Sequence, residues 1–119
     1  MANDAEANKG MAVIAYILFF VPLIAGTHKT SPFVKYHTNQ GTILFIFAVA
    51  WSIVLGILSA ILTAIAVALY AFALLTIFSL LIGLLYLVPL VLVILGIVNA
   101  VGGKMKPLPL IGERFTIIK

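Results

Sequence analysis

The chain lacks charge over an unusually long stretch. From Gly41 to Gly103, 63 consecutive residues contain no Asp, Glu, Lys, Arg or His. A soluble domain cannot bury such a segment on every face, whereas about 20 apolar helical residues cross the roughly 30 Å hydrocarbon core of a bilayer. The sequence therefore predicts an integral membrane protein.

Cysteine is absent, so disulfides, thiolate metal sites and redox pairs are excluded. Charged residues make up 8% of the chain, against about 25% in ordinary globular domains. The net charge is +4, but the bases lie in short segments beside apolar runs. Anionic lipid headgroups explain that placement better than a nucleic-acid backbone does, so we expect a lipid bilayer partner and no nucleic acid.

Chemistry-bearing groups are also scarce. The apolar stretches contain no ionisable residue of the kind that coupled pumps and transporters keep inside the membrane. No nucleophile and base, paired carboxylates or metal-ligand spacing occurs, so we predict no enzyme activity, no cofactor and no metal site. The serines of the apolar runs have no His or acid nearby in sequence, and bonding to the helix carbonyls is their ordinary role.

The apolar pattern predicts an all-α, polytopic membrane protein forming a single domain over residues 1–119. The preferred spans lie near 11–26, 40–58, 61–80 and 84–101. A cleaved signal peptide is the rival interpretation of residues 11–26, but acidic residues precede that run and Pro22 lies within it. The alternative is three spans, two of them about 29 residues long.

Length and charge favour different span counts. Three spans of about 19 residues fit the stretch after residue 40 better than two overlong ones, which favours four in total. Three spans in total place both basic segments, 27–40 and 104–119, on one side, as the positive-inside rule requires. Only weak turn signals, such as Gly56 and Gly83, divide the stretch. We predict four spans.

Residues 27–40 are predicted to contain a short interfacial helix that starts at Ser31 and Pro32 and runs into the second span. Ser31 and Pro32 are typical of an N-cap and a first helical residue. His37 and Gln40 then share one helix face at the membrane boundary. We favour a packing role for them, with a proton-sensitive gate at His37 as the alternative, since histidine titrates near physiological pH. Asn39 is a further polar candidate in this segment.

Small residues recur every four positions from residue 48 to residue 68, and such a ladder lets helices approach closely in a membrane. Its members are Ala48, Ser52, Gly56, Ala60, Ala64 and Ala68. We predict a packing face, either within the chain or between subunits. The ladder's continuity also favours one long helix through 48–68, in keeping with the three-span alternative. Asn99 is a hydrogen-bonding candidate near the end of the last span. Gly102 and Gly103 predict a left-handed helix end. We expect four lysines to face lipid headgroups: Lys29, Lys35, Lys104 and Lys106.

Two short segments carry a family resemblance, namely residues 32–41 (PFVKYHTNQG) and residues 99–112 (NAVGGKMKPLPLIG). With the long apolar block between them, they resemble small membrane proteins related to the channel-forming subunit of the chloroplast inner-envelope protein-import translocon. The resemblance implies four spans and makes His37 and Gln40 the most characteristic positions.

Two functions follow as hypotheses, both in the inner (cytoplasmic) membrane as a multi-pass protein. The first, by analogy with that family, is a translocation or transport component. The alternative is an accessory or structural subunit, bound to a larger complex through the small-residue face. A homo-oligomer or membership of a larger membrane complex is expected in either case.

Overall fold

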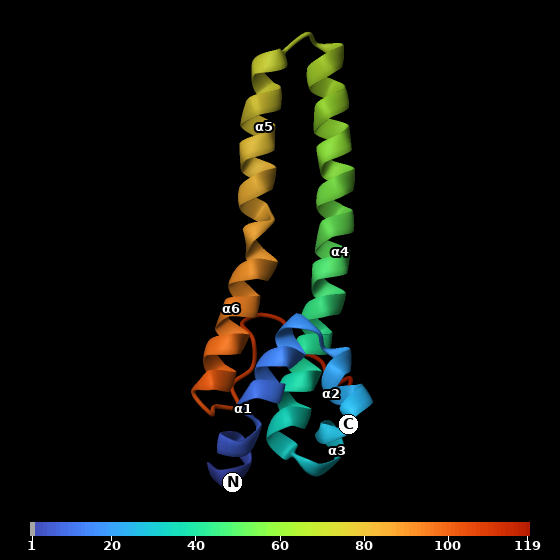
Figure 1. Cartoon of the computed structure of the whole chain (residues 1–119). Helices are drawn as coiled ribbons and strands as arrows, with labels where there is room; N and C mark the ends of the chain where they lie inside the picture. Colours follow the sequence, from blue (N-terminus) through green and yellow to red (C-terminus); the bar gives the residue numbers. More distant parts are fainter. Residues whose placement is uncertain (1) are drawn as a thin grey trace.

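The computed structural model describes residues 2–119, and within them it contains helices, turns and irregular segments but no strand. The helices are α1 (Ala2–Ile17), α2 (Phe20–Ala25), α3 (Thr27–Thr30), α4 (Pro32–Ala68), α5 (Phe72–Leu85) and α6 (Leu87–Val101). The chain measures 61 × 22 × 22 Å. An antiparallel hairpin of α4 against α5 and α6 makes up its length, and both termini lie at the other end from the turn (Figure 1). The prediction of an all-α chain is confirmed.

α4 begins where the sequence predicts a helix start. Ser31 is extended and its side chain accepts a hydrogen bond from the backbone N–H of Val34 at 3.0 Å, while Pro32 occupies the first helical position. The N-cap prediction is confirmed. The helix then continues without interruption to Ala68, so it runs into the second span as predicted, but residues 32–40 are its first turns and not a separate interfacial helix. α3 covers only four residues, and the rest of that segment is the start of α4.

The hairpin turn is at residues 69–71. The N–H of Ala71 bonds to the carbonyl of Ala66, and the N–H of Tyr70 bonds to that of Val67. This is the pattern of a Schellman helix end, whose left-handed position usually holds glycine. Here Tyr70 takes that position with φ of +52°. Because no glycine marks the turn, the sequence pattern did not reveal it.

A break between α5 and α6 at Tyr86 interrupts the returning arm. Pro89 has no N–H to bond the carbonyl of Leu85 one turn earlier. The indole N–H of Trp51, on α4, donates to that carbonyl at 2.7 Å instead. The arm therefore stays helical on both sides of the break, because the carbonyl left unpaired by Pro89 receives a hydrogen bond from α4.

Residues 11–26 do not form the straight span that we predicted. α1 ends at Ile17, and α2 carries Pro22 in its first turn, where proline is tolerated. In a continuous helix the Pro22 ring would collide with the carbonyl of Leu18, so the chain breaks at residues 18–19. α1 rises beside the base of the hairpin and α2 returns towards α3 (Figure 1).

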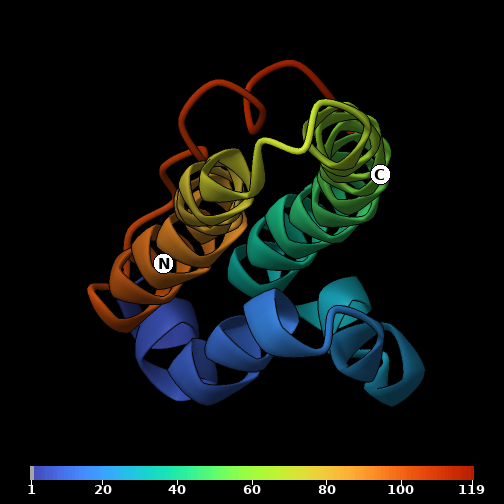
Figure 2. The same cartoon turned by 90° about the horizontal axis from the view of Figure 1, so that it is seen from above.

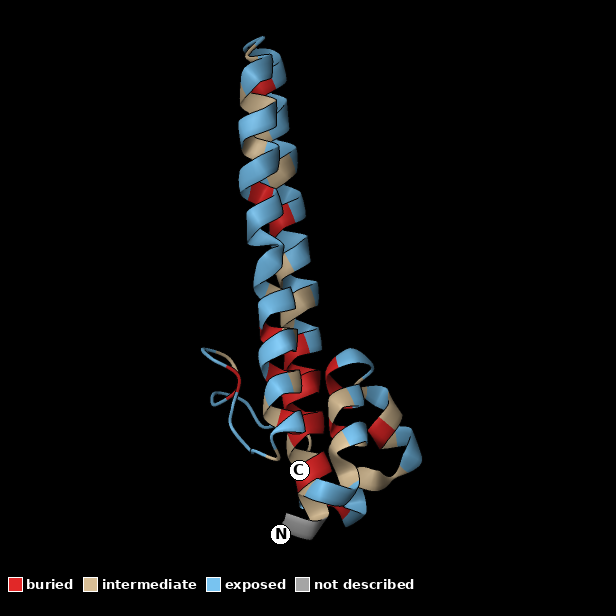
Figure 3. Cartoon of the chain, turned by 60° about the vertical axis from the view of Figure 1, so that its left-hand side comes forward, coloured by how far each residue is buried: buried red, intermediate tan, exposed pale blue. Residues whose placement is uncertain are grey.

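The ends of the chain surround the base of the hairpin. α1–α3 lie along one side and the segment after α6 lies along another (Figures 2 and 3). The buried apolar core is located there, and it consists of Ala12, Tyr16, Phe33, Leu44, Leu92, Ala100 and Leu108. Two glycines allow close approach: a Cβ at Gly41 would overlap the Ala15 carbonyl, and one at Gly96 would overlap the Tyr16 ring.

Beyond the base, the hairpin exposes apolar side chains on most of its surface (Figure 3). Pro32–Ala68 and Phe72–Val101 are each long and apolar enough to cross a membrane, and only 17% of the most apolar window of each is buried. A core helix of a soluble protein would be mostly buried, so lipid is the environment that these surfaces require. The chain is a membrane protein with two long apolar helices.

The four predicted spans do not appear as four helices. Residues 40–58 and 61–80 were predicted as separate spans, but α4 runs through residues 59 and 60 without a turn. Residues 80–84 are likewise continuous within α5. The two long helices match the two long spans of the three-span alternative. Neither Gly56 nor Gly83 breaks its helix, because a single glycine costs a helix only about 1 kcal/mol.

Candidate functional site

The polar residues singled out in the sequence gather at the base of the hairpin. His37, Asn39 and Gln40 lie in the first turns of α4, and all three are buried. Each one bonds to the backbone of the segment after α6, between 67 and 79 residues away in sequence. These side chains therefore hold the C-terminal segment against α4.

His37 joins three parts of the fold. Its Nε2 lies 2.8 Å from the carbonyl oxygen of Lys104, which can only accept, so Nε2 carries the proton. Its Nδ1 then accepts from the hydroxyl of Tyr16 on α1, at 2.5 Å. The rings of Tyr16, Phe33 and Tyr36 surround the imidazole, with centroids 4.6–5.5 Å away. Both nitrogens of a neutral histidine are thus satisfied in a buried setting.

Gln40 and Asn39 act on the backbone further along the same segment. The Gln40 amide donates to the carbonyl of Gly112 at 2.9 Å and accepts from the N–H of Leu108 at 2.8 Å. Asn39 Oδ1 accepts from the N–H groups of Ile117 and Ile118 at 2.6 and 2.9 Å. The segment after α6 forms no regular helix or strand that would pair its own N–H and C=O groups. Gln40 and Asn39 provide hydrogen-bond partners for several of them.

A second polar cluster fixes the entry to α4. Asp4 accepts from the Ser31 hydroxyl at 2.5 Å and from the N–H of Phe33 at 3.1 Å. The carboxylate so placed also complements the positive end of the α4 dipole. The hydrogen bond from Ser31, reinforced by those from Phe33 and Asn8, holds the pKa of Asp4 below its ordinary value against the opposing effect of burial.

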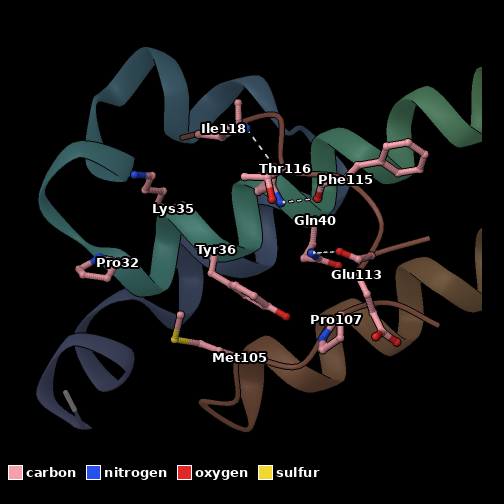
Figure 4. Close-up of a pocket in the computed structure, with 12 residues that line it drawn as sticks. Pro32, Lys35, Tyr36, Gln40, Met105, Pro107, Glu113, Phe115, Thr116 and Ile118 are labelled. Atoms are coloured by element: carbon pink, nitrogen blue, oxygen red, sulfur yellow. Dashed lines mark hydrogen bonds between the residues drawn. The ribbon is translucent and has the colours of Figure 1, made fainter. Parts of the chain in front are cut away.

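A groove of about 490 Å³ runs between the first turns of α4 and the C-terminal segment (Figure 4). Tyr36 reaches from α4 towards the stretch that carries Met105 and Pro107, as Figure 4 shows. Lys35 and Glu113 are its charged lining residues. With one cation and one anion, the groove has no strong preference for a charged ligand.

The remaining candidates lie apart from this cluster. Asn99 is at the end of α6, where its amide is 3.5 Å from the Lys106 carbonyl, a long and weak contact. Gly103, just beyond α6, has φ of +70°, which confirms the predicted left-handed helix end. The four lysines belong to α3, the first turn of α4 and the segment after α6.

The small-residue ladder does not face the opposite arm of the hairpin. Leu55 and Ala66 are buried between the arms, whereas Ser52, Gly56, Ala60, Ala64 and Ala68 are exposed and Ala48 is half-buried. A Cβ added at Gly56 would meet no atom within 4 Å. Packing within the chain is therefore not the role of this face.

The polar side chains of the described residues serve contacts within the fold. No three His, Asp or Glu side chains group there in a way that could hold a metal ion. The buried polar groups bond to backbone atoms and to one another, and Thr38 Oγ1 is the one buried side-chain oxygen or nitrogen of the described part without a partner.

Sequence reasoning missed several residues that build the site. Tyr16 lies in the predicted span 11–26, Asp4 precedes that span and Gly112 lies in the basic segment 104–119, and none of them was selected as a site residue. A Cβ at Gly112 would overlap Gln40 Oε1 and the N–H of Leu108. One local signal was available, namely Gly41 directly after Gln40. A glycine within a membrane helix indicates that another helix packs closely there.

Comparison with known proteins gives a family. The model of the magnetosome magnetite crystal formation protein family matches residues 7–116. No curated protein and no solved structure matches the chain. The expected relationship to the chloroplast import channel is therefore wrong, and with it the translocation role that depended on that resemblance. The matched region includes α1 from residue 7 onward, the whole hairpin and most of the C-terminal segment, so the chain belongs to the magnetosome magnetite crystal formation protein family.

Proposed function

We propose that this chain is a non-enzymatic accessory or structural subunit of the membrane in which magnetite crystals form. Family membership supports the setting. The observation that carries the subunit role is the exposed small-residue face of α4. Where the chain uses glycines for its own close packing, at Gly41 and Gly96, the space is filled, whereas the space beside Gly56 is empty.

The occupant that fits this face is a transmembrane helix of a larger complex. In lipid, helices associate through close backbone approach rather than through the hydrophobic effect, and small residues permit that approach. Residues spaced by four rotate by about 40° per step on a 3.6-residue helix, so the ladder winds around α4 and a crossing helix meets its central members around Gly56. Leucine side chains of lipid-facing α4 surfaces offer no comparable groove.

A substitution on the face tests this role. Gly56→Leu should leave the fold of the isolated chain intact, because no atom of the chain lies nearby. It should release the chain from its complex in mild detergent and alter the size of the magnetite crystals formed in the host cell. Val54→Phe adds bulk on another exposed surface of α4 and serves as the matched control. If Gly56→Leu stays in a complex of wild-type size with wild-type crystals, the face is not the contact.

We also infer how the chain lies in the membrane. From Phe45 to Ala68 the α4 arm is about 36 Å long, enough to cross the hydrocarbon core with some tilt. All basic residues belong to α1, α3, the first turn of α4 or the C-terminal segment, while the turn at 69–71 has no charge. By the positive-inside rule the base with both termini faces the cytoplasm.

The bend between α1 and α2 then enters only one leaflet. Leu18 lies about 14 Å along the helix from Lys9, roughly half the thickness of the core. Ile17, Leu18 and Ile24 at the bend are exposed apolar residues, and Ile24 is 80% exposed. This arrangement removes the conflict between length and charge, because neither basic segment has to face outward.

A further inference from the structure

A second cavity lies beside α3 and the start of α4. Its volume is about 420 Å³, and it is lined by His28, Lys29, Thr30, Pro32, Lys35 and Lys119. No Asp or Glu side chain lines it. A cleft whose lining side chains carry charge of one sign concentrates the field and attracts counter-ions.

The cations of this cavity have no anionic partner among the described residues. Lys9 and Glu6 form the one ion pair among the described residues, and neither residue lines the cavity. Asp4 lies at the start of α4, but its carboxylate already accepts hydrogen bonds from Ser31 and Phe33. Glu113 lines the neighbouring groove and not this cavity, while Lys35 lines both. With no Asp or Glu in the lining, the side chains of the cavity carry net positive charge that an external anion can neutralise.

Apolar surface adjoins this charge. α2 leads into α3 through Gly26, and His28 Nδ1 lies 3.3 Å from the Pro22 carbonyl, which ties the two short helices together. On α2, Phe20 and Ile24 are exposed. A cationic cavity and an apolar surface thus lie within a few residues of each other, as the two parts of an amphiphile require.

We propose that this cavity binds the phosphate group of an anionic phospholipid, whose acyl chains lie against α2. Lys29 and Lys35 supply ammonium groups to the phosphate oxygens. That the cavity lies at the level of the headgroups follows from the membrane placement inferred under the proposed function, on which this step rests. The site does not depend on the proposed subunit role, since it uses a different surface of the chain.

The test uses the full chain purified in a neutral detergent. Dioctanoyl phosphatidylglycerol is titrated against thermal unfolding, and retained lipid is counted by native mass spectrometry. Dioctanoyl phosphatidylcholine and inorganic phosphate are the comparison probes. The variant is Lys29→Gln/Lys35→Gln, and the matched control is Lys104→Gln/Lys106→Gln, which removes the same charge from lysines outside the cavity.

We expect phosphatidylglycerol to raise the unfolding temperature of the wild type and of the control alike. Each cavity lysine removed should weaken its binding about fivefold. Equal weakening in the control would show nonspecific surface attraction and overturn the site. So would an equal response to phosphatidylcholine, whose phosphate is neutralised by choline. If inorganic phosphate alone reproduces the full shift, the ligand is free phosphate and not a lipid.

Discussion

At the scale of single residues, the buried side chains of α4 fasten distant backbone, and His37 shows how closely the chemistry is matched. One ring nitrogen must donate, to Lys104, and the other must accept, from Tyr16. A neutral imidazole does both at once. The packing role that we favoured for His37 accounts for these contacts without a proton-transfer function.

We predict that His37→Leu destabilises the chain by about 1–3 kcal/mol, because it leaves the Tyr16 hydroxyl and the Lys104 carbonyl unpaired in a buried site. His37→Gln should retain much of that stability, since an amide can both donate and accept. Thermal unfolding in detergent provides the comparison. If His37→Gln instead abolished a pH dependence of partner binding between about pH 5 and 8, the proton-sensing alternative would be right.

Asp4 makes stability depend on pH at the acidic end. Its pKa is lower in the folded chain than in the unfolded one, chiefly because Ser31 donates to the carboxylate. The stabilisation is therefore fully present above the ordinary carboxyl pKa of about 3.9, and it is lost as the pH falls through the lower folded value. Unfolding measured from pH 7 to pH 2 should show this loss in the wild type. Asp4→Asn should be less stable at neutral pH, and its stability should change less than that of the wild type as the pH falls. An acidic loss of stability unchanged by Asp4→Asn would count against the assignment.

At the scale of elements, the break between α5 and α6 is supported from across the hairpin. We predict that Trp51→Phe costs about 1–2 kcal/mol, because the Leu85 carbonyl then has no partner in an apolar setting. Pro89→Ala restores an N–H that can bond that carbonyl within the helix. The cost of Trp51→Phe should therefore be smaller in the Pro89→Ala background. A double-mutant cycle on unfolding free energies measures this coupling, and strictly additive effects would contradict it.

The two α4 glycines give opposite predictions within one helix. Gly41→Ala should destabilise the chain by about 1–3 kcal/mol, because its Cβ would overlap the α1 backbone. Gly56→Ala should stabilise it by about 0.5–1 kcal/mol, since helix propensity rises and no atom is displaced. Chemical unfolding in a fixed detergent compares them. Equal effects at both sites would mean that α1 does not cross α4 at Gly41.

At the scale of the whole molecule, the hairpin arrangement predicts which residues share a side of the membrane. The chain has no native cysteine, so single cysteines at Asn8, Thr30, Tyr70 and Lys119 can be labelled with an impermeant thiol reagent. We expect positions 8, 30 and 119 to label from one side and position 70 from the other. The four-span prediction places position 30 opposite both 8 and 119, and the three-span alternative places 30 and 119 together opposite 8. Either labelling pattern would contradict the hairpin arrangement.

Much of this architecture was readable from local pattern. The membrane class follows from a charge-free stretch, because no other solvent accepts it. The start of α4 at Ser31 and Pro32 and the left-handed end at Gly103 follow from backbone sterics and unpaired N–H and C=O groups, which act within a few residues. His37, Asn39 and Gln40 could be selected as a polar group on α4 for the same reason, but their partners could not.

The sequence by itself thus determined that this protein is helical, lies in a membrane and keeps its charge near the ends of the chain. Tertiary structure alone decided that Tyr70 turns the hairpin and that the C-terminal segment lies on α4. Those outcomes depend on contacts between residues far apart in sequence: Trp51 with Leu85, His37 with Tyr16, Gln40 with Leu108. The local helix and turn propensities of the sequence do not indicate such pairings, because each one is stabilised only when the whole base of the hairpin has packed.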